Sequence, residues 1–332
     1  MMATPAFRCI RQHWPAARIV LVIWDTVAPV LHGADWFDRV ILYRAGRDLF
    51  ADAGELMHRV REVRRERCEL GLILPNSFSS ALMLWLAGVE RRVGYARDAR
   101  SVLLTDAVPC PSEGGRFQPT YMVDYYLALC RAAGAQPQDR RTQLPCREQN
   151  MAAARDILAR AGIELRRPLF LLHPGAAFGP SKLWLKERWA ALAEALHEES
   201  GAQVACVGVP EDGPLVRRIA GMCRMPLADL TKCGIDLHLL KGVVRLSQLL
   251  VTTDSGPRHY GVALGVPTVC LMGSTHPGYS TSGLPHDWVV RVDVECGPCQ
   301  RKVCRRDHRC MELLTTDMAL RACRQVLQAA QG

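Results

Sequence analysis

Long apolar runs are absent from this sequence of 332 residues. No stretch approaches the roughly 20 consecutive apolar residues of a membrane-spanning helix, and residues 1–14 lack the apolar core of a signal peptide. Aromatic residues are also few, at 6%, and none form a stripe with basic residues on which nucleic-acid bases could stack. These absences predict a soluble, cytoplasmic protein.

Charge is unevenly balanced, with 42 Lys and Arg against 33 Asp and Glu and a formal net charge of +9. A basic protein favours anionic partners such as nucleotide phosphates, acidic lipid surfaces or nucleic acid. The charge is scattered except in segments 59–67 and 301–309, and the first of these is typical of a solvated helix face. We expect no nucleic-acid partner, because only the net charge points to one.

Apolar strands that alternate with helices predict two α/β domains, each built on a doubly wound parallel sheet. In the first half the expected strands are 17–24, 39–43, 70–75 and 91–96, with helices at 47–67 and 78–88. In the second half the expected strands are 167–175, 202–210, 249–254, 267–273 and 287–293, with helices at 186–200, 214–223 and 257–265. The polar segment 135–150 predicts a boundary between domains 1–148 and 149–332.

The loops that follow strands are the candidate site, because ligands of such sheets bind outside the carboxyl ends of the strands. The segment TTDSGPRHYGVALGVP places Asp254, Ser255 and Gly256 between an expected strand and an expected helix. The free amides at the start of that helix favour an anion, and Asp254 could accept a hydrogen bond from a sugar hydroxyl. An ordinary capped turn is the competing interpretation.

Three other strand-end loops carry polar candidates. In HPGAAFGPSKLW, Ser181 and Lys182 suit a diphosphate, although the P-loop pattern is absent and a solvated surface lysine is the alternative. Glu211 in GVPEDG is placed to bind ribose hydroxyls or simply forms a turn. Asn76 and Ser77 in LPNSFSSAL either meet the hydroxyls of an acceptor or cap the next helix.

Four segments together resemble the heptosyltransferases of glycosyltransferase family 9, most of all the lipopolysaccharide heptosyltransferase II group. They are, in chain order, LPNSFSSAL, HPGAAFGPSKLW, TTDSGPRHYGVALGVPTVCLMGST and CGPCQRKVCRRDHRCM. The resemblance covers nearly the whole chain, and its strongest parts are the Asp-Ser-Gly-x-x-His segment and the lysine-bearing loop.

The resemblance implies a GT-B fold, with two Rossmann-like domains facing a cleft and a last helix that packs back on the N-terminal domain. It implies inverting, metal-independent transfer of heptose from ADP-heptose to the glycolipid (lipid A-core) acceptor of the lipopolysaccharide inner core, without a cofactor. The enzyme would work at the cytoplasmic face of the inner membrane, in peripheral contact with it.

The resemblance also assigns roles to single residues. Lys182 matches the lysine that holds the leaving diphosphate. Asp254, Ser255 and Gly256 match the loop that binds the phosphates and sugar of the donor, with His259 close by. The carboxylate that binds ribose is Glu211 or its neighbour, one residue away.

The start of the chain departs from the family pattern of a strand, a Gly-Asp loop and a helix. The helix is expected to begin within MMATPAFRCIR, where Thr4 survives from the motif as a substrate-binding residue. The strand and the Asp that serves as general base are expected before Met1, in a natural product about 15 residues longer. The alternative is a nucleotide-sugar-binding protein without catalysis.

Fourteen cysteines are present, and four of them cluster near the C-terminus. Cys296, Cys299, Cys304 and Cys310 follow the spacing C-x2-C-x4-C-x5-C, with His308 inside it. In a cytoplasmic protein such a cluster points first to metal, as tetrahedral structural zinc or an iron–sulfur cluster. Reduced thiols and a disulfide remain as alternatives.

Overall fold

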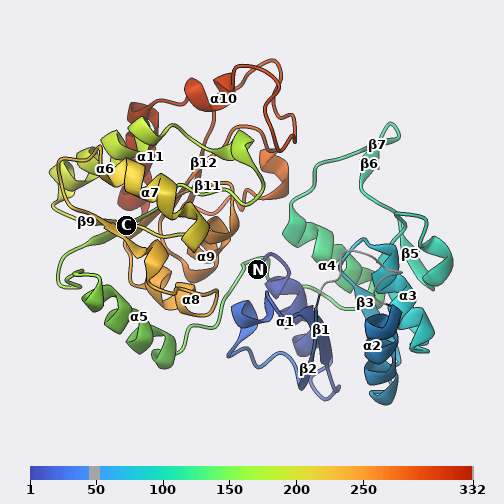
Figure 1. The fold of residues 1–332 in the computed structure, drawn as a ribbon. Coiled ribbons are helices and arrows are strands. Elements are labelled where there is room, and N and C mark those ends of the chain that lie inside the picture. The colour runs from blue at the N-terminus through green and yellow to red at the C-terminus, as the bar shows by residue number, and fades with distance from the viewer. Residues whose placement is uncertain (45–52, 331–332) are drawn as a thin grey trace. The chain divides into compact units, whose positions relative to one another are not determined.

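The computed structural model describes residues 1–44 and 53–330, and it divides the chain between Gln143 and Leu144 into two compact units. Both units are of the α/β kind (Figure 1). Within the described residues, no helix is long and apolar enough to cross a membrane.

The C-terminal unit is built on a six-stranded parallel sheet with the order β10-β9-β8-β11-β12-β13. Its strands are β8 (Leu169–His173), β9 (Gln203–Cys206), β10 (Leu227–Asp229), β11 (Leu249–Thr253), β12 (Thr268–Leu271) and β13 (Asp287–Val290). Its helices are α5 (Glu148–Arg160), α6 (Lys186–Ser200), α7 (Gly213–Ala220), α8 (Leu239–Arg245), α9 (Gly256–Leu264), α10 (Arg309–Glu312) and α11 (Thr316–Ala329). All five strands expected in this half are confirmed, and β10 is an additional short strand.

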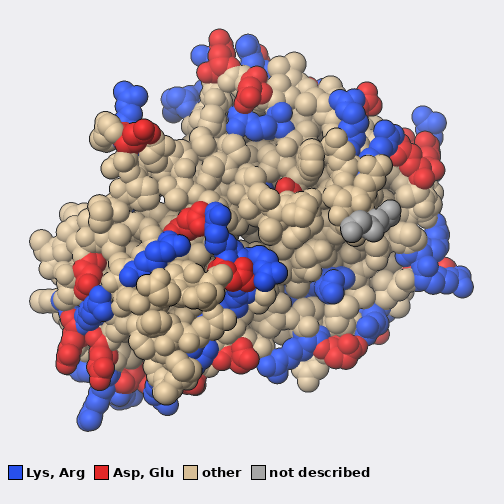
Figure 2. All heavy atoms as spheres, turned by 180° about the vertical axis from the view of Figure 1, so that it is seen from behind, with Lys and Arg blue, Asp and Glu red and all other residues tan. Residues whose placement is uncertain are grey.

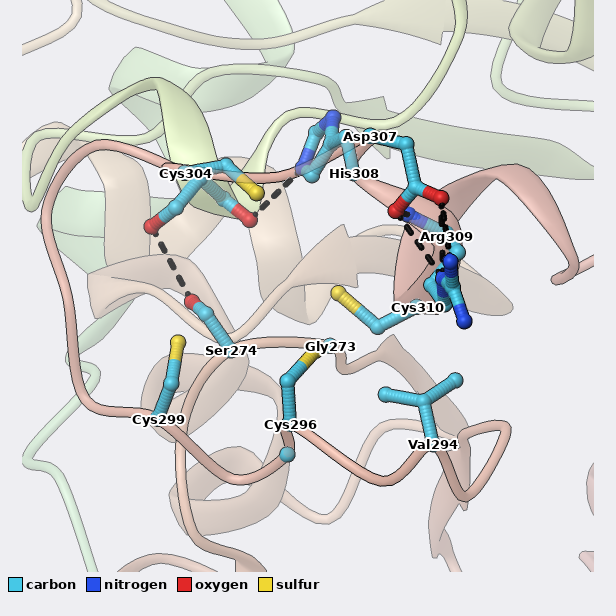
Figure 3. Close-up of a pocket in the computed structure, with 12 residues that line it drawn as sticks. Gly273, Ser274, Val294, Cys296, Cys299, Cys304, Asp307, His308, Arg309 and Cys310 are labelled. Carbon is cyan, nitrogen blue, oxygen red and sulfur yellow. Dashed lines mark hydrogen bonds and ion pairs between the residues drawn. The ribbon is translucent and has the colours of Figure 1, made fainter.

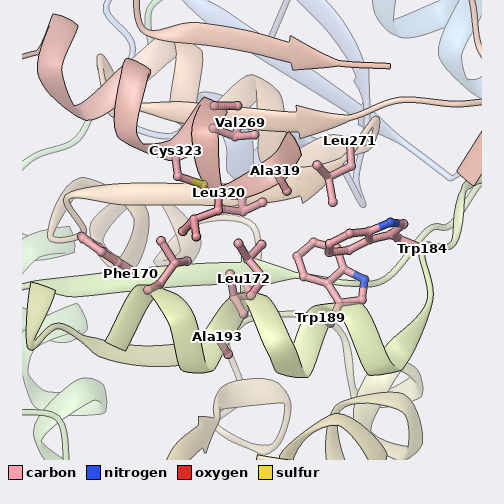
Figure 4. Close-up of a cluster of buried hydrophobic side chains, with 14 of the residues drawn as sticks. Phe170, Leu172, Trp184, Trp189, Ala193, Val269, Leu271, Ala319, Leu320 and Cys323 are labelled. Atoms are coloured by element: carbon pink, nitrogen blue, oxygen red, sulfur yellow. The ribbon is translucent and has the colours of Figure 1, made fainter. Parts of the chain in front are cut away.

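The core of this unit lies where α6 and α11 cover the sheet (Figure 4). Strands β8, β11 and β12 are buried at every residue, as expected for a parallel sheet covered on both faces. Trp189 of α6 is fully buried and packs edge-on against Trp184, with ring centroids 5.2 Å apart. The last helix, α11, contributes its apolar face to this same core, including Leu320 and Cys323.

The N-terminal unit holds its parallel strands in two separate sheets, with the orders β1-β2 and β3-β4-β5. Its strands are β1 (Val20–Trp24), β2 (Arg39–Tyr43), β3 (Leu70–Ile73), β4 (Arg91–Tyr95) and β5 (Asp106–Val108), with an antiparallel hairpin of β6 (Ser112–Glu113) and β7 (Arg116–Phe117). Its helices are α1 (Thr4–His13), α2 (Ala53–Arg65), α3 (Phe78–Leu86) and α4 (Met122–Ala133). The first part of the helix expected at 47–67 lies outside the described residues.

The two N-terminal sheets do not pair with each other, so each has open edges. Among the described residues, β1 pairs only with β2 and β3 pairs only with β4. Each sheet therefore ends in a strand with one row of unpaired backbone groups, which ordinarily needs cover. The strand expected before Met1 stays a prediction.

Close packing of α8 against α5 depends on Gly242. A Cβ atom at this position would lie 2.3 Å from the backbone oxygen of Asn150 and 2.7 Å from the Cβ of Ala154. Backbone cannot yield as a flexible side chain does, so the two helices would have to separate.

We expect Gly242→Ala to lower the free energy of unfolding by about 1–3 kcal/mol through overpacking, although alanine favours a helix by about 1 kcal/mol. Gly54→Ala in α2 is the matched control, because nothing lies within 4 Å of its added Cβ. Urea unfolding of both variants tests this, and equal stability of the two would contradict the packing argument.

Candidate functional site

Polar side chains gather at the carboxyl end of the six-stranded sheet, beside its two central strands. Strand order runs outward from β8 through β9 on one side and from β11 through β12 on the other. The ends of β8 and β11 are therefore the topological switch point, where doubly wound sheets bind ligands. Lys182 follows β8 and Asp254 follows β11, and the structure brings the two side chains together.

The Lys182 ammonium is almost completely buried and contacts Asp254 twice. Its Nζ donates to the Asp254 carboxylate at 2.9 Å and also to the Asp254 backbone oxygen. The ring of Phe178 lies under it, with its centroid 4.7 Å from Nζ, an arrangement that adds a cation–π attraction. The alternative of a solvated surface lysine is therefore wrong.

Asp254 is the point at which three loops meet. Besides Lys182, its carboxylate accepts from the hydroxyls of Thr275 at 2.7 Å and Ser280 at 3.1 Å, both in the loop after β12. Arg258 of α9 lies 3.4 Å away. Burial alone would raise the pKa of Asp254, but the charge and hydrogen bond of Lys182 outweigh burial and lower it to about 2.

Arg258 holds this network to the edge of the sheet. Its guanidinium is fully buried and pairs with both carboxylate oxygens of Asp287, at 3.1 and 3.0 Å. Burial tends to raise the pKa of Asp287, but the neighbouring Arg258 lowers it overall. The buried charges of Arg258 and Asp287 are tolerated because each is paired with the other in a fixed geometry.

The start of α9 offers its amides to a ligand. Ser255 is the N-cap residue, and its side chain makes no capping hydrogen bond to any described part of the helix. Its hydroxyl instead lies 3.1 Å from Nδ1 of His173. The first-turn amides of α9, beginning at Gly256, thus remain a place for an anion. His259 is in the same turn, half-buried.

His173, the last residue of β8, was expected only as part of a strand. It is buried, and burial lowers its pKa to about 4, so it is neutral near pH 7. Its Nδ1 also lies 3.3 Å from the hydroxyl of Thr252. A histidine at the carboxyl end of an apolar strand is the signal that could have placed it in the site.

The two acidic residues of the loop after β9 lie in different environments. Asp212 lies against the backbone, with its carboxylate 2.5 Å from the position of an added Cβ at Gly175 and 2.6 Å from that at Gly208. It also accepts from the amide of Val209 at 3.1 Å. Glu211 is exposed, which leaves its carboxylate available to a ribose.

The N-terminal candidates make local contacts in their own unit. Ser77 caps α3 through the amide of Ser80 at 3.3 Å, so the capping interpretation is confirmed for it. Asn76 accepts from the buried Arg100 and from the Tyr125 hydroxyl, both at 3.2 Å. The Thr4 hydroxyl accepts from the amide of Gln143 at 3.1 Å. Substrate binding by these residues stays a prediction.

The four clustered cysteines surround one small pocket (Figure 3). All four are free, which argues against the disulfide alternative. Burial and the charges of the other three cysteines raise the pKa of Cys310. As the side chains are placed, no three Cys, His, Asp or Glu groups in the described ranges are grouped closely enough to hold one ion.

Comparisons with known proteins agree with this architecture. The sequence model of glycosyltransferase family 9 (heptosyltransferase) matches residues 57–309. Lipopolysaccharide heptosyltransferase 2 of Escherichia coli K12 is 27% identical over 287 residues, which is 84% of this chain and 81% of the relative.

Two solved structures share the fold. The E. coli ADP-heptose lps heptosyltransferase II has a TM-score of 0.81 at 24% identity, covering 100% of this chain and 96% of its own. A family 9 glycosyl transferase from Veillonella parvula has a TM-score of 0.83 at 18% identity, covering 98% and 93%. The expected GT-B type of fold is confirmed by these neighbours.

The neutral, buried His173 makes stability depend on pH. Its pKa is below the ordinary value of 6.5, so the unfolded chain binds a proton that the folded chain does not. This part of the stability is present above pH 6.5 and is lost as the pH falls toward 4, by up to about 3 kcal/mol.

We therefore expect His173→Asn to lose less of its unfolding free energy than the parent between pH 7 and pH 4.5. Urea unfolding at the two pH values measures this, with the exposed His13→Asn as control. An identical pH dependence in the parent and His173→Asn would show that His173 is not held neutral.

Proposed function

The chain belongs to glycosyltransferase family 9, and on that premise we propose that it transfers heptose from ADP-heptose to the lipopolysaccharide inner core. The observation that carries the proposal is the buried Lys182–Asp254 pair beside the free amides of α9, at the switch point of the sheet. That arrangement suits a diphosphate leaving group.

The reaction needs a group that stabilises the negative charge of the leaving group. In the inverting mechanism, a hydroxyl oxygen of the acceptor attacks the anomeric carbon from the face opposite ADP, and the proton of that hydroxyl passes to a general base. The bond between that carbon and the diphosphate oxygen breaks, and negative charge develops on the diphosphate. Lys182 donates to this charge together with the α9 amides near Gly256, while Glu211 binds the ribose and His259 the donor. None of these steps draws on a metal ligand.

The charge of the protein indicates the general class of the acceptor. Figure 2 shows Lys and Arg interspersed with Asp and Glu over the face drawn, and no large patch of one sign. The net charge of +9 nevertheless favours an acidic glycolipid and peripheral contact with an anionic membrane. Asn76, Ser77 and Thr4 are the proposed acceptor-side and substrate-binding residues, with Ser181 beside Lys182 on the donor side.

Lys182 is the first residue to test. We expect Lys182→Ala to reduce kcat for ADP-heptose about 100- to 1,000-fold, because the leaving diphosphate loses its cation. Lys186→Ala is the matched control, since Lys186 is more exposed and pairs with Glu187 on the surface. Circular dichroism reports whether the fold survives. Activity within a few-fold of the parent would exclude the proposed role.

A second candidate is binding of the nucleotide sugar without catalysis. It differs from the transfer reaction in needing no general base for the acceptor hydroxyl. Binding and turnover measured side by side separate the two functions. Both candidates predict binding of ADP, as measured by calorimetry, and only the transferase releases ADP from ADP-heptose at a catalytic rate in the presence of an acceptor. Binding without turnover would favour the second candidate.

A further inference from the structure

The loop that carries the four clustered cysteines has little regular structure of its own. Between β13 and α10, residues 291–308 contain no helix or strand. Such long irregular segments are uncommon in compact domains and usually serve a function. The hydrogen bonds of a helix or a strand therefore do not hold this segment in shape.

All four thiols face one cavity of about 20 Å³ (Figure 3). That volume is of the order of one water molecule or ion. Cys310 is the buried member of the four, and its sulfur would be 2.9 Å from a Cβ added to Gly273. The other ten cysteines are spread singly along the sequence, and only Cys9 and Cys130 are recorded in contact with each other, so a convergence of four is particular to this segment of the described chain.

A hydrogen bond and an excess of basic residues favour negative charge on the sulfur atoms. The amide of Arg306 donates to Sγ of Cys304 at 3.4 Å, a contact that stabilises a charged sulfur. Residues 293–310 contain five Lys and Arg against three Asp and Glu. Four thiolates around a divalent cation carry two negative charges, and this excess of two positive charges balances them.

Histidine is not needed as a fifth ligand. Nε2 of His308 lies 2.9 Å from the backbone oxygen of Ser181, which occupies that nitrogen. Asp307 pairs with Arg309. The sulfur atoms are therefore the ligands that the pocket offers, and four sulfurs in tetrahedral geometry select zinc or iron.

We propose that Cys296, Cys299, Cys304 and Cys310 bind one thiophilic cation, zinc or iron, which closes the loop 293–310. Among the described residues no three such groups are arranged to hold an ion, so binding requires the sulfur atoms to move to about 2.3 Å from the metal. Cys296, Cys299 and Cys304 lie outside any helix or strand and can move toward Cys310 of α10 without breaking one.

The closed loop would brace the loop that holds Lys182. Ser181 donates through its amide to the backbone oxygen of Lys302 at 3.1 Å and through its hydroxyl to that of Arg301. Gly179, with φ of 148°, leaves no room for a Cβ, which would meet the Lys302 oxygen at 2.5 Å. The proposed metal site is thus structural, and it holds the loop of the proposed donor site in place.

Metal content of the purified chain is the direct test. The protein is prepared anaerobically without chelator and analysed by inductively coupled plasma mass spectrometry, then titrated with Zn²⁺ or Fe²⁺ after reduction. We expect about one ion per chain, lost in Cys299→Ser and Cys304→Ser. Cys223→Ser, at the end of α7 and outside the cluster, should retain it. A spectrum of the Co²⁺-loaded protein should show sulfur-to-metal charge transfer.

The outcomes are distinct, and none depends on transferase activity. Zinc or iron at one equivalent supports the site and says which metal it takes. Failure of the reduced protein to bind one equivalent, or a disulfide between any two of the four cysteines, would overturn it. Hydrogen exchange at the Ser181 amide tests the brace: exchange should speed up at least ten-fold on metal removal in the parent, and an unchanged rate would refute the brace alone.

Discussion

The buried carboxylate of Asp254 is the interaction on which the candidate site depends. It accepts from Lys182 after β8, from Thr275 and Ser280 after β12, and lies beside Arg258 of α9. A buried carboxylate is costly unless it is fully paired. Because its partners come from different strand ends, satisfying this one charge fixes the loops relative to each other.

The same pairing prepares Lys182 for its proposed role. An ammonium has three donors, and two of them are used on Asp254. One donor remains for a ligand, and the side chain does not have to be ordered when the ligand arrives. In the proposed reaction, Asp254 would also limit the attraction of Lys182 for a diphosphate in the ground state. The neighbouring amides of α9 add attraction for the anion, so the two features together favour charge that develops on the leaving group.

The sequence predicted five of the six strands of the C-terminal unit and the strand-end position of Lys182 and Asp254, because apolar periodicity and loop chemistry are local signals. It did not predict β10, α5 or α8. It could not predict that these residues pair, since contact across 72 positions depends on β8 lying next to β11. The Arg258–Asp287 pair was missed for the same reason. Asp212 packs inward and Glu211 does not, because the Asp212 carboxylate lies close to the backbone at two glycines. The spacing of residues in the sequence does not predict such a contact.

The basic segment 301–309 shows how a charge run is misleading when it is considered alone. Arg306 pairs with Glu295 and Arg309 with Asp307, so part of its charge is already compensated. Its backbone oxygens at Arg301 and Lys302 accept from Ser181, which ties the segment to the lysine-bearing loop. A surface for nucleic acid would leave its cations free and its backbone unengaged. These contacts tie the segment to the loop that carries Lys182, so in the proposed enzyme it would support the donor site, and a metal bound by the four cysteines would keep that support rigid.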